Sequence, residues 1–203
     1  MVFRRSGKAP RIDSTARVAE SAHIIGDVTI QGGCYIDHHV VIESAGPPIE
    51  IGHGVIIFAG SVVRSVGGQS RPPFAVAIGN RTLIAPHCTI TGCHIGRHCY
   101  VATAAIVLQG ATVGDHSRLG IASIVHAKAT LPNGTRVGMR HIAVPTRDGF
   151  MSTAAIDRAR EAVGAADFFE SAFGLEETDP VSLHERVMTQ LLNEVHAWDD
   201  RPL

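Results

Sequence analysis

The segment Ile95–Val137 reads IGRHCY VATAAI VLQGAT VGDHSR LGIASI VHAKAT LPNGTR V in groups of six residues, and every group opens with Ile, Val or Leu. The same spacing runs back to Ile12, with three extra residues near Gly46, a longer insertion between Val63 and Ile78, and one residue dropped just before the quoted segment. Twenty aliphatic residues share this position: Ile12, Val18, Ile24, Ile30, Ile36, Ile42, Ile51, Ile57, Val63, Ile78, Ile84, Ile90, Ile95, Val101, Val107, Val113, Leu119, Val125, Leu131 and Val137.

The other positions of the repeat are restricted too. The fifth residue of a group is small or β-branched, and glycine is frequent at the second, where a tight corner favours a residue without a Cβ. The spacing is neither the 3.6-residue period of a helix nor the alternation of an ordinary β-sandwich. We predict an all-β solenoid, a parallel β-helix of triangular coils whose large aliphatic side chains point inward. Three groups form one coil, so twenty groups form six to seven coils, stacked ~4.8 Å apart.

The repeat divides the chain into a β-helix over residues 1–145 and a helical extension over residues 146–203. Ser152 is a candidate cap for a first helix that would run to Phe173. A second helix is predicted to begin at Pro180, since proline is favoured in the first helical turn. We expect these helices to pack along the β-helix and cover an open sheet edge. A role in stabilising an oligomer or binding a partner is the alternative.

Charge and hydropathy exclude several functional classes. Lys and Arg together number 18 and Asp and Glu 19, and no basic block follows Arg4-Arg5. Nucleic acid and anionic membranes are therefore not expected as partners. No apolar run approaches the ~20 residues that span a bilayer, and the first ten residues lack the apolar core of a secretory signal. We expect a cytoplasmic protein whose four cysteines are reduced.

The segment His87–Cys99, HCTITGCHIGRHC, resembles a metal site in composition. In the register of the repeat, however, Cys88 and Cys99 are both fifth residues on different sides of the triangle, so they cannot share an ion. We interpret them as small interior residues. His98 and His116 are eighteen residues apart and should stack on the outside of consecutive coils.

Two segments carry a family resemblance: HIIGDVTI (His23–Ile30) and IGNRTLIAPHCTITGCHIGRHCYVATAAIVLQGATVGDHSRLGIASIV (Ile78–Val125). They resemble the left-handed β-helix of the hexapeptide-repeat superfamily, and within it the γ-class carbonic anhydrases, including the shortened group. The resemblance implies a left-handed coil, which periodicity alone does not establish. It also implies a homotrimer whose sites form between packed faces, and a zinc ion held by three histidines that activates a water molecule.

The residues of that zinc chemistry are replaced in this chain. Arg64, Pro86 and Thr91 stand at the three positions where the resemblance places the histidines. Glu43–Ala45 replaces an Arg-Gly-Asp segment, and Phe58–Ala59 replaces a Gln-Asp pair that borders the family's active site. We therefore predict no metal site of the usual kind, and carbonic anhydrase activity is not expected.

We predict a γ-carbonic-anhydrase-like homotrimer that lacks the zinc triad and binds or acts on a small molecule at its subunit interfaces. Phe58, Arg64 and Thr91 are the predicted substrate-binding residues. If the protein is an enzyme, acyl transfer from acyl-CoA is the favoured chemistry, with His87 as general base. Three other histidines could take that role: His38, His39 and His53.

Two alternatives stay open. One is a zinc-dependent carbonic anhydrase or hydratase with rearranged ligands, and the other is a non-catalytic scaffold similar to the pointed-end subunits of dynactin. The insertion Ser65–Ala77, which contains Gly67-Gly68 and Arg71-Pro72-Pro73-Phe74, is predicted to be either a mobile loop that covers a cleft or a plain solvent loop.

Overall fold

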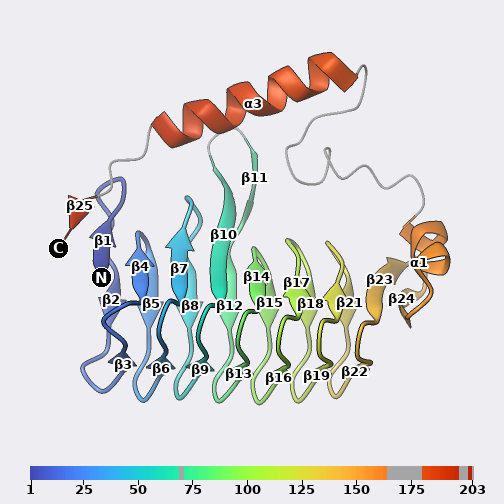
Figure 1. Cartoon of the computed structure of the whole chain (residues 1–203), viewed down its shortest axis with the longest axis horizontal. Coiled ribbons are helices and arrows are strands. Elements are labelled where there is room, and N and C mark those ends of the chain that lie inside the picture. Colours follow the sequence, from blue (N-terminus) through green and yellow to red (C-terminus); the bar gives the residue numbers. More distant parts are fainter. Residues whose placement is uncertain (69–70, 164–179, 197–200, 203) are drawn as a thin grey trace.

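The computed structural model describes residues 1–68, 71–163, 180–196 and 201–202. The chain winds into a left-handed parallel β-helix with three flat faces, which confirms the predicted fold class (Figure 1). It passes repeatedly from face I to face II to face III, and each coil adds one short strand to each face. The corners between the faces are named I–II, II–III and III–I.

Face I is an eleven-stranded sheet. Its parallel strands are β1 (Val2–Arg4), β4 (His23–Ile25), β7 (Val41–Ser44), β10 (Val62–Gly68), β14 (Thr89–Thr91), β17 (Ile106–Val107), β20 (Ile124–Val125) and β23 (Ile142–Thr146). The seven strands of face II are β2 (Arg11–Ile12), β5 (Val28–Ile30), β8 (Ile49–Ile51), β12 (Val76–Ile78), β15 (His94–Ile95), β18 (Thr112–Val113) and β21 (Thr130–Leu131). The seven of face III are β3 (Arg17–Val18), β6 (Tyr35–Ile36), β9 (Ile56–Ile57), β13 (Leu83–Ile84), β16 (Tyr100–Val101), β19 (Arg118–Leu119) and β22 (Arg136–Val137).

The aliphatic residues of the repeat form one continuous core. In face I, Ile42 pairs with Val63 and Val63 with Ile90, and all three side chains are 0% exposed. Small fifth residues such as Ser61 and Cys88 fill the corners beside them. Burial of apolar surface in this column is the main stabilising contribution, because each short strand has few other contacts. Strands β1 and β23 lie outside the counted groups, so face I has more coils than the repeat predicts.

The glycines at the second position serve a different purpose from the one expected. A Cβ on Gly79 would lie 2.5 Å from the backbone nitrogen of Arg97 in the next coil, so close stacking excludes a side chain. The tight backbone turn comes two residues later, where φ is positive at non-glycine residues such as His87 (59°) and His98 (55°). The need for glycine is therefore steric rather than conformational.

The insertion Ser65–Ala77 forms a β-hairpin rather than an irregular loop. Strand β10 continues to Gly68 and pairs antiparallel with β11 (Arg71–Phe74), with an irregularity at Val66–Gly68. Phe74 packs over corner I–II, since a Cβ on Gly92 would lie 2.6 Å from its Cβ. In Figure 1 the hairpin projects beyond the neighbouring strands of face I.

Both ends of face I are covered by antiparallel strands. β24 (Gly149–Thr153) folds back onto β23, and β25 (Arg201–Pro202) pairs with β1. The two chain ends therefore meet at the first coil (Figure 1). Covering an edge in this way removes a template for unwanted strand pairing.

The helical extension agrees in part with expectation. α1 (Ile156–Val163) packs against β23 and β24, and α3 (Pro180–His196) begins at the predicted proline. The Ser152 cap is wrong, because Ser152 lies in β24 and Thr153 Oγ1 accepts the hydrogen bond from Ala155 N instead. The predicted continuation of the first helix to Phe173 lies outside the described residues. No helix in the described part is long and apolar enough to cross a bilayer.

Candidate ligand-binding site

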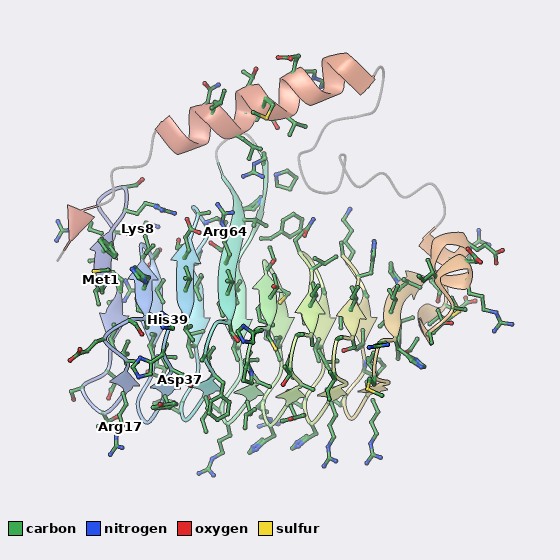
Figure 2. The ribbon with its side chains drawn as sticks, viewed as in Figure 1. Met1, Lys8, Arg17, Asp37, His39 and Arg64 are labelled. Atoms are coloured by element: carbon green, nitrogen blue, oxygen red, sulfur yellow. The ribbon has the colours of Figure 1, made fainter. Side chains whose placement is uncertain are left out.

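The outer side of face I is mainly aliphatic, with one short polar row and two further polar residues, His23 and Thr89. Arg64 in β10 lies in register between Glu43 in β7 and Thr91 in β14. Figure 2 shows Arg64 on β10, in the middle of the stack of face I strands. The outward residues around the row are half-buried and apolar: Ile25, Val41, Val62, Ile106, Leu108 and Ile124. The structure thus brings together two of the predicted substrate-binding residues, Arg64 and Thr91.

Arg64 belongs to a chain of three charged side chains. Its Nε lies 3.2 Å from Glu43 Oε2, and Arg5 Nη1 lies 2.6 Å from Glu43 Oε1. Arg5 reaches this point from the turn after β1 and also contacts the carbonyl oxygen of Ser44 at 3.5 Å. The side chains of Arg5, Glu43 and Arg64 are 6%, 17% and 40% exposed, so the chain leads from the interior to the surface.

Phe58 and His87 lie on adjacent coils at corner III–I. Phe58 follows β9, and its ring contacts Tyr35 edge-on at a centroid distance of 6.5 Å. His87 is exposed, and its ring lies over the backbone of the preceding coil, because a Cβ on Gly60 would be 2.5 Å from its Nδ1. The corner presents an imidazole on a rigid backbone.

The two pairs of predicted residues are separated within one chain. His87 lies in the corner turn before β14, where its φ is 59°, and Thr91 is the last residue of that strand. Arg64 lies beside Thr91, at the far end of face I from His87. One chain therefore does not bring Phe58, Arg64, His87 and Thr91 into a single cluster.

Corner III–I also contains a hydroxyl–imidazole contact that sequence reasoning missed. Ser21 Oγ lies 2.8 Å from His38 Nδ1 and accepts a hydrogen bond from His39 N at 3.2 Å. The neighbouring Asp37 accepts a hydrogen bond from His38 N at 2.8 Å, and this bond is the main cause of its lowered pKa. Ser21 and His39 are one coil apart in the sequence, and this spacing could have indicated that they are neighbours.

The residues at the three family zinc positions do not fit a zinc ion. Arg64 is a permanently protonated guanidinium with no lone pair to donate, and it is paired with Glu43. Pro86 has no donor atom in its side chain, and a threonine hydroxyl is not among the usual zinc ligands. Among the described residues of one chain, no group of three or more His, Cys, Asp or Glu side chains could hold a metal.

The histidine and cysteine segment is distributed as the repeat predicts. Cys88, Cys93 and Cys99 are buried at corners III–I, I–II and II–III, respectively, so their thiols do not converge. Burial raises the pKa of Cys93 to about 12. The rings of His98 and His116 stack with centroids 5.1 Å apart and planes 2° apart, which confirms the predicted column.

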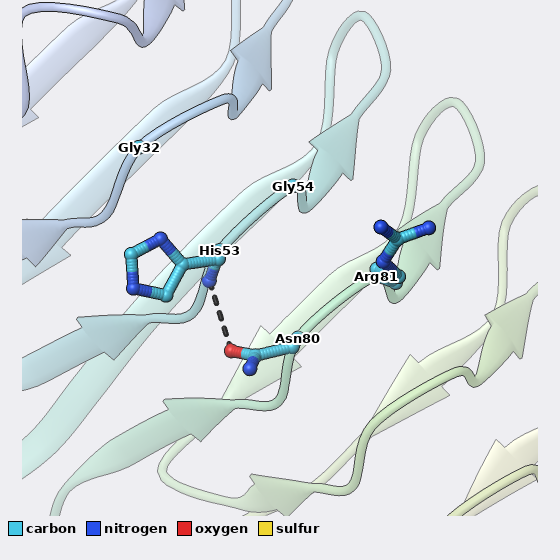
Figure 3. Close-up of a pocket in the computed structure, with 5 residues that line it drawn as sticks. All are labelled: Gly32, His53, Gly54, Asn80 and Arg81. Carbon is cyan, nitrogen blue, oxygen red and sulfur yellow. Dashed lines mark hydrogen bonds between the residues drawn. The ribbon is translucent and has the colours of Figure 1, made fainter.

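A shallow pocket of about 350 Å3 lies at corner II–III, away from Arg64 and His87 (Figure 3). His53 N donates a hydrogen bond to Asn80 Oδ1 at 2.9 Å. The hollow exists because consecutive coils place glycine at this corner. Its lining residues are Gly32, His53, Gly54, Asn80 and Arg81.

Comparison with known proteins agrees with this architecture. No protein-family profile matches the chain. It is 30% identical over 107 residues to mitochondrial gamma carbonic anhydrase 1 of Arabidopsis thaliana, a match covering 51% of this chain and 38% of that protein. It is 32% identical over 107 residues to the carboxysome assembly protein CcmM of Synechocystis, which covers 49% of this chain and 16% of that protein.

A solved structure extends the likeness to the whole chain. A Bacillus cereus protein that carries the name of an acetyltransferase aligns with a TM-score of 0.54 and 19% identity over 94% of this chain and 92% of that one. The chain shares the hexapeptide-repeat left-handed β-helix fold, and about half of it is similar in sequence to the Arabidopsis and Synechocystis proteins. At this identity the solved structure shows the fold alone. The hexapeptide-repeat protein also spans well under half the length of both curated relatives.

Proposed function

We propose that this hexapeptide-repeat protein binds and acts on a small molecule at an interface between copies of the chain, without the histidine-bound zinc of γ-carbonic anhydrases. The separation of the Arg64–Thr91 pair from the Phe58–His87 pair carries this proposal. If corner III–I of one copy packs on face I of another, the first copy supplies an imidazole to the Arg64–Thr91 pair of the second, whose own His87 lies in the corner turn before β14.

The chemistry of the three faces supports a closed assembly. Face I is mostly aliphatic, and the middle of face III exposes Tyr35 and Tyr100 (38% and 46%) in register with Ile56 and Leu83, while Arg17, Arg118 and Arg136 continue the same column at its ends. Face II instead carries mainly polar outward residues: Arg11, Thr29, Glu50, His94, Thr112 and Thr130. A ring of identical subunits requires two different complementary surfaces on each copy. The mostly aliphatic face I and the apolar middle of face III are the two surfaces that we assign to the interface of a homotrimer.

The proposed chemistry is acyl transfer from acyl-CoA to a hydroxyl or amine. His87 accepts the proton of the acceptor as its oxygen or nitrogen attacks the thioester carbon, and CoA leaves as the thiol after taking up a proton. The exposed imidazole of His87 is held by its packing on Gly60. Carbonic anhydrase chemistry is not proposed, because the donor set at Arg64, Pro86 and Thr91 does not fit zinc.

The test combines assembly and ligand binding in the full-length protein. Native mass spectrometry is expected to show a trimer, and titration with acetyl-CoA a saturable thermal shift that Tyr35→Ser weakens by disrupting the apolar middle of face III. His87→Ala should keep the trimer and abolish acyl transfer to hydroxylamine as a model acceptor, whereas His94→Ala on face II should leave both unchanged. A monomer, or a trimer with no response to acetyl-CoA, would contradict the proposal.

A mixing experiment addresses the shared site directly. Arg64→Gln and His87→Ala subunits are each expected to be inactive when pure, but co-refolded trimers should recover part of the activity. Sites that draw Arg64 from one copy and His87 from another are intact in a fraction of the hybrids. No recovery in hybrids shown to form by mass spectrometry would place the site within one chain.

A further inference from the structure

Corner II–III carries a ladder of side-chain oxygens that links one coil to the next. Asn133 Oδ1 accepts a hydrogen bond from Asp115 N at 2.8 Å, and Asp115 Oδ1 accepts one from Arg97 N at 2.9 Å. Nearer the start of the chain, Asn80 Oδ1 accepts a hydrogen bond from His53 N at 2.9 Å (Figure 3). Each oxygen satisfies a backbone N–H group in the turn of the preceding coil.

The ladder is interrupted at Gly32. The residue in register with Gly32 on the next coil is His53, and an imidazole has no oxygen to offer. Gly32 N donates no hydrogen bond to another described residue, whereas the neighbouring Gly33 N donates to Thr15 Oγ1 at 3.0 Å. The N–H group of Gly32 therefore lacks the oxygen acceptor that the same turn position has on the coil of His53.

The interruption coincides with the pocket of about 350 Å3, which is lined by Gly32, His53, Gly54, Asn80 and Arg81. The carbonyl oxygens of Gly32, His53 and Asn80 each already accept a backbone hydrogen bond, at 3.0, 2.9 and 2.9 Å. Asn80 N, like Gly32 N, donates to no described residue, because the residue in register on the next coil is an arginine. The pocket is thus rich in donors, and its ligand must supply acceptor oxygens.

Arg81 supplies a positive charge at this pocket. It is exposed, and its side chain makes no hydrogen bond or ion pair with another described residue, whereas Arg97 on the next coil pairs with Asp115 at 2.8 Å. Arg81 leans over the preceding coil, since a Cβ on Gly54 would lie 3.7 Å from its Cγ. In Figure 3, Arg81 and His53 stand on either side of Gly54.

We propose that this pocket binds the phosphate group of a small polar molecule such as a sugar phosphate. Gly32 N–H, Arg81 and His53 are the proposed donors. They come from three consecutive coils, so the ligand needs oxygens that point in several directions, which a tetrahedral phosphate offers and a planar carboxylate does not. Backbone N–H groups combined with a positive charge are typical of phosphate sites. The site uses none of the residues assigned to the subunit interface and does not depend on it.

Asp13 is an acid at the same corner, and its charge opposes the proposed ligand. A Cβ on Gly32 would lie 3.2 Å from Asp13 Oδ1. Hydrogen bonds from the side chain and the backbone of Thr15 lower the pKa of Asp13, and the nearby His53 lowers it further. Asp13→Asn keeps an acceptor for Thr15 and should tighten phosphate binding by about twofold. Weaker binding would mean that the Asp13 turn holds the ligand, and would overturn the assignment.

The experiment titrates ribose 5-phosphate, inorganic phosphate and ribose into the full-length protein at constant ionic strength, followed by calorimetry. Ribose 5-phosphate should bind most tightly, and ribose should not bind measurably. Arg81→Gln should lower the affinity for ribose 5-phosphate at least about tenfold, because a charge-assisted hydrogen bond is lost. No binding of either phosphate, or equal binding of ribose, would overturn the proposal. Equal binding of the two phosphates would overturn the part that concerns the rest of the molecule.

Arg140→Gln is the matched control. Arg140 is an exposed arginine in the equivalent turn position of corner III–I, with φ of 58° against 55° at Arg81. Its N donates to Ile121 O at 2.9 Å, as Arg81 N donates to His53 O at 2.9 Å. Arg140→Gln should leave ribose 5-phosphate binding unchanged. An equal loss in Arg81→Gln and Arg140→Gln would mean that binding follows overall charge, and would overturn the assignment.

Two substitutions of His53 test the interrupted ladder. His53→Asn introduces an oxygen that should accept the hydrogen bond from Gly32 N, as Asn80 Oδ1 accepts that of His53 N. It should raise the melting temperature by about 2 °C and weaken ribose 5-phosphate binding at least about tenfold. His53→Ala removes the imidazole but leaves Gly32 N–H available, so its loss should be only about threefold.

The contribution of Gly32 can also be followed directly. In two-dimensional NMR spectra of the parent protein, the amide proton of Gly32 should shift downfield as ribose 5-phosphate is added, because it gains a charged acceptor. An unshifted Gly32 amide at saturation, or a loss in His53→Asn no greater than in His53→Ala, would show that Gly32 N–H does not bind the ligand. Either result would overturn the proposed site.

Discussion

The coils over Ile95–Val137 and those over Ile42–Ile90 share one interior column but differ on the outside. In the later coils every group has six residues, whereas the earlier coils carry an insertion near Gly46 and the β10–β11 hairpin. Both irregularities fall at corner I–II and leave the inward aliphatic residues in register. The Glu43–Arg64–Thr91 row lies in the earlier coils. The core thus tolerates irregularity only at corners, and the candidate site lies beside it.

The largest effect should come from the interior, equally in both regions. Ile90→Ala in the earlier coils and Leu119→Ala in the later ones remove side chains that are 0% and 1% exposed. Each should lower the free energy of unfolding by about 3–4 kcal/mol, because a stacked column cannot collapse around the cavity. Ile121→Ala, at a residue 51% exposed, should cost less than about 0.5 kcal/mol. Denaturant unfolding measures all three, and a small cost for Ile90→Ala alone would break the equivalence.

The second largest loss of stability should come from the charged side chains of Arg5, Glu43 and Arg64. The later coils have no equivalent of this group. Glu43→Gln removes the carboxylate that lies 2.6 Å from Nη1 of Arg5, a side chain that is 6% exposed, and should cost about 2 kcal/mol. Lys8→Gln removes an ion pair to Asp27 whose lysine is 58% exposed, and should cost less than about 0.5 kcal/mol. Thermal unfolding of both variants provides the comparison. Similar costs would mean that Glu43 behaves as an ordinary surface residue.

Substitution of the buried cysteines should change the free energy of unfolding by a smaller amount, which differs between a regular and an irregular corner. Cys99 is a fifth residue of the repeat, and one coil later Ser117 fills the same place with its hydroxyl 3.4 Å from a carbonyl oxygen. Cys99→Ser should therefore cost less than about 0.5 kcal/mol. Cys93 stands at the dropped residue, where burial raises the pKa of the thiol to about 12, and Cys93→Ser should cost about 1–2 kcal/mol. Chemical denaturation distinguishes the two, and equal costs would show that the irregular corner is no drier than a regular one.

The smallest effect should be a pH dependence shared by both regions. The pKa of Asp115 is lowered from 3.8 chiefly by the hydrogen bond from Arg97 N and then by the Arg97 side chain, and that of Asp37 by the bond from His38 N. The folded protein binds these protons more weakly than the unfolded chain. The stabilisation is therefore present above the unfolded-state value of about 3.9 and is lost as the pH falls through the lower folded-state values.

Asp115→Asn tests that dependence in the later coils, and Asp37→Asn tests it just before the earlier coils begin. Each variant should show a shallower loss of stability between about pH 5 and pH 2 than the parent, and no change in slope above about pH 5. Melting temperatures across this range provide the measurement. An unchanged acid slope in both variants would show that the two carboxylates do not contribute.

The fold was predictable because a single physical constraint repeats. Each coil stacks on the next at a constant spacing, so the residue that points inward must be aliphatic at every sixth position, and Ile42, Val63 and Ile90 follow that rule on both sides of the insertions. The stack of His98 on His116 and the burial of the cysteines follow from the same six-residue spacing.

The candidate site was less predictable, because its residues point outward and obey no period. Arg64 and Thr91 were identified through a family resemblance, but their partner Arg5 was not. Arg5 lies before the repeat begins, in a segment that only the pairing of β1 with β4 brings beside Glu43. The prediction that Ser152 caps a helix was wrong for a similar reason. Ser152 pairs with Ala143 in the antiparallel ladder of β24 on β23, which the local sequence does not indicate.

The sequence by itself determined the solenoid, the direction of every repeated side chain and the absence of histidine from the three family zinc positions. The first two follow from local spacing, because each residue's direction is set by its place in a six-residue group, and the third follows from the family resemblance. Only the tertiary structure decided that the chain ends meet at the first coil, that the insertion is a hairpin, and that Arg5, Glu43 and Arg64 form one charged chain. These features join segments that no period relates, and their energies depend on contacts formed only after the coils have stacked.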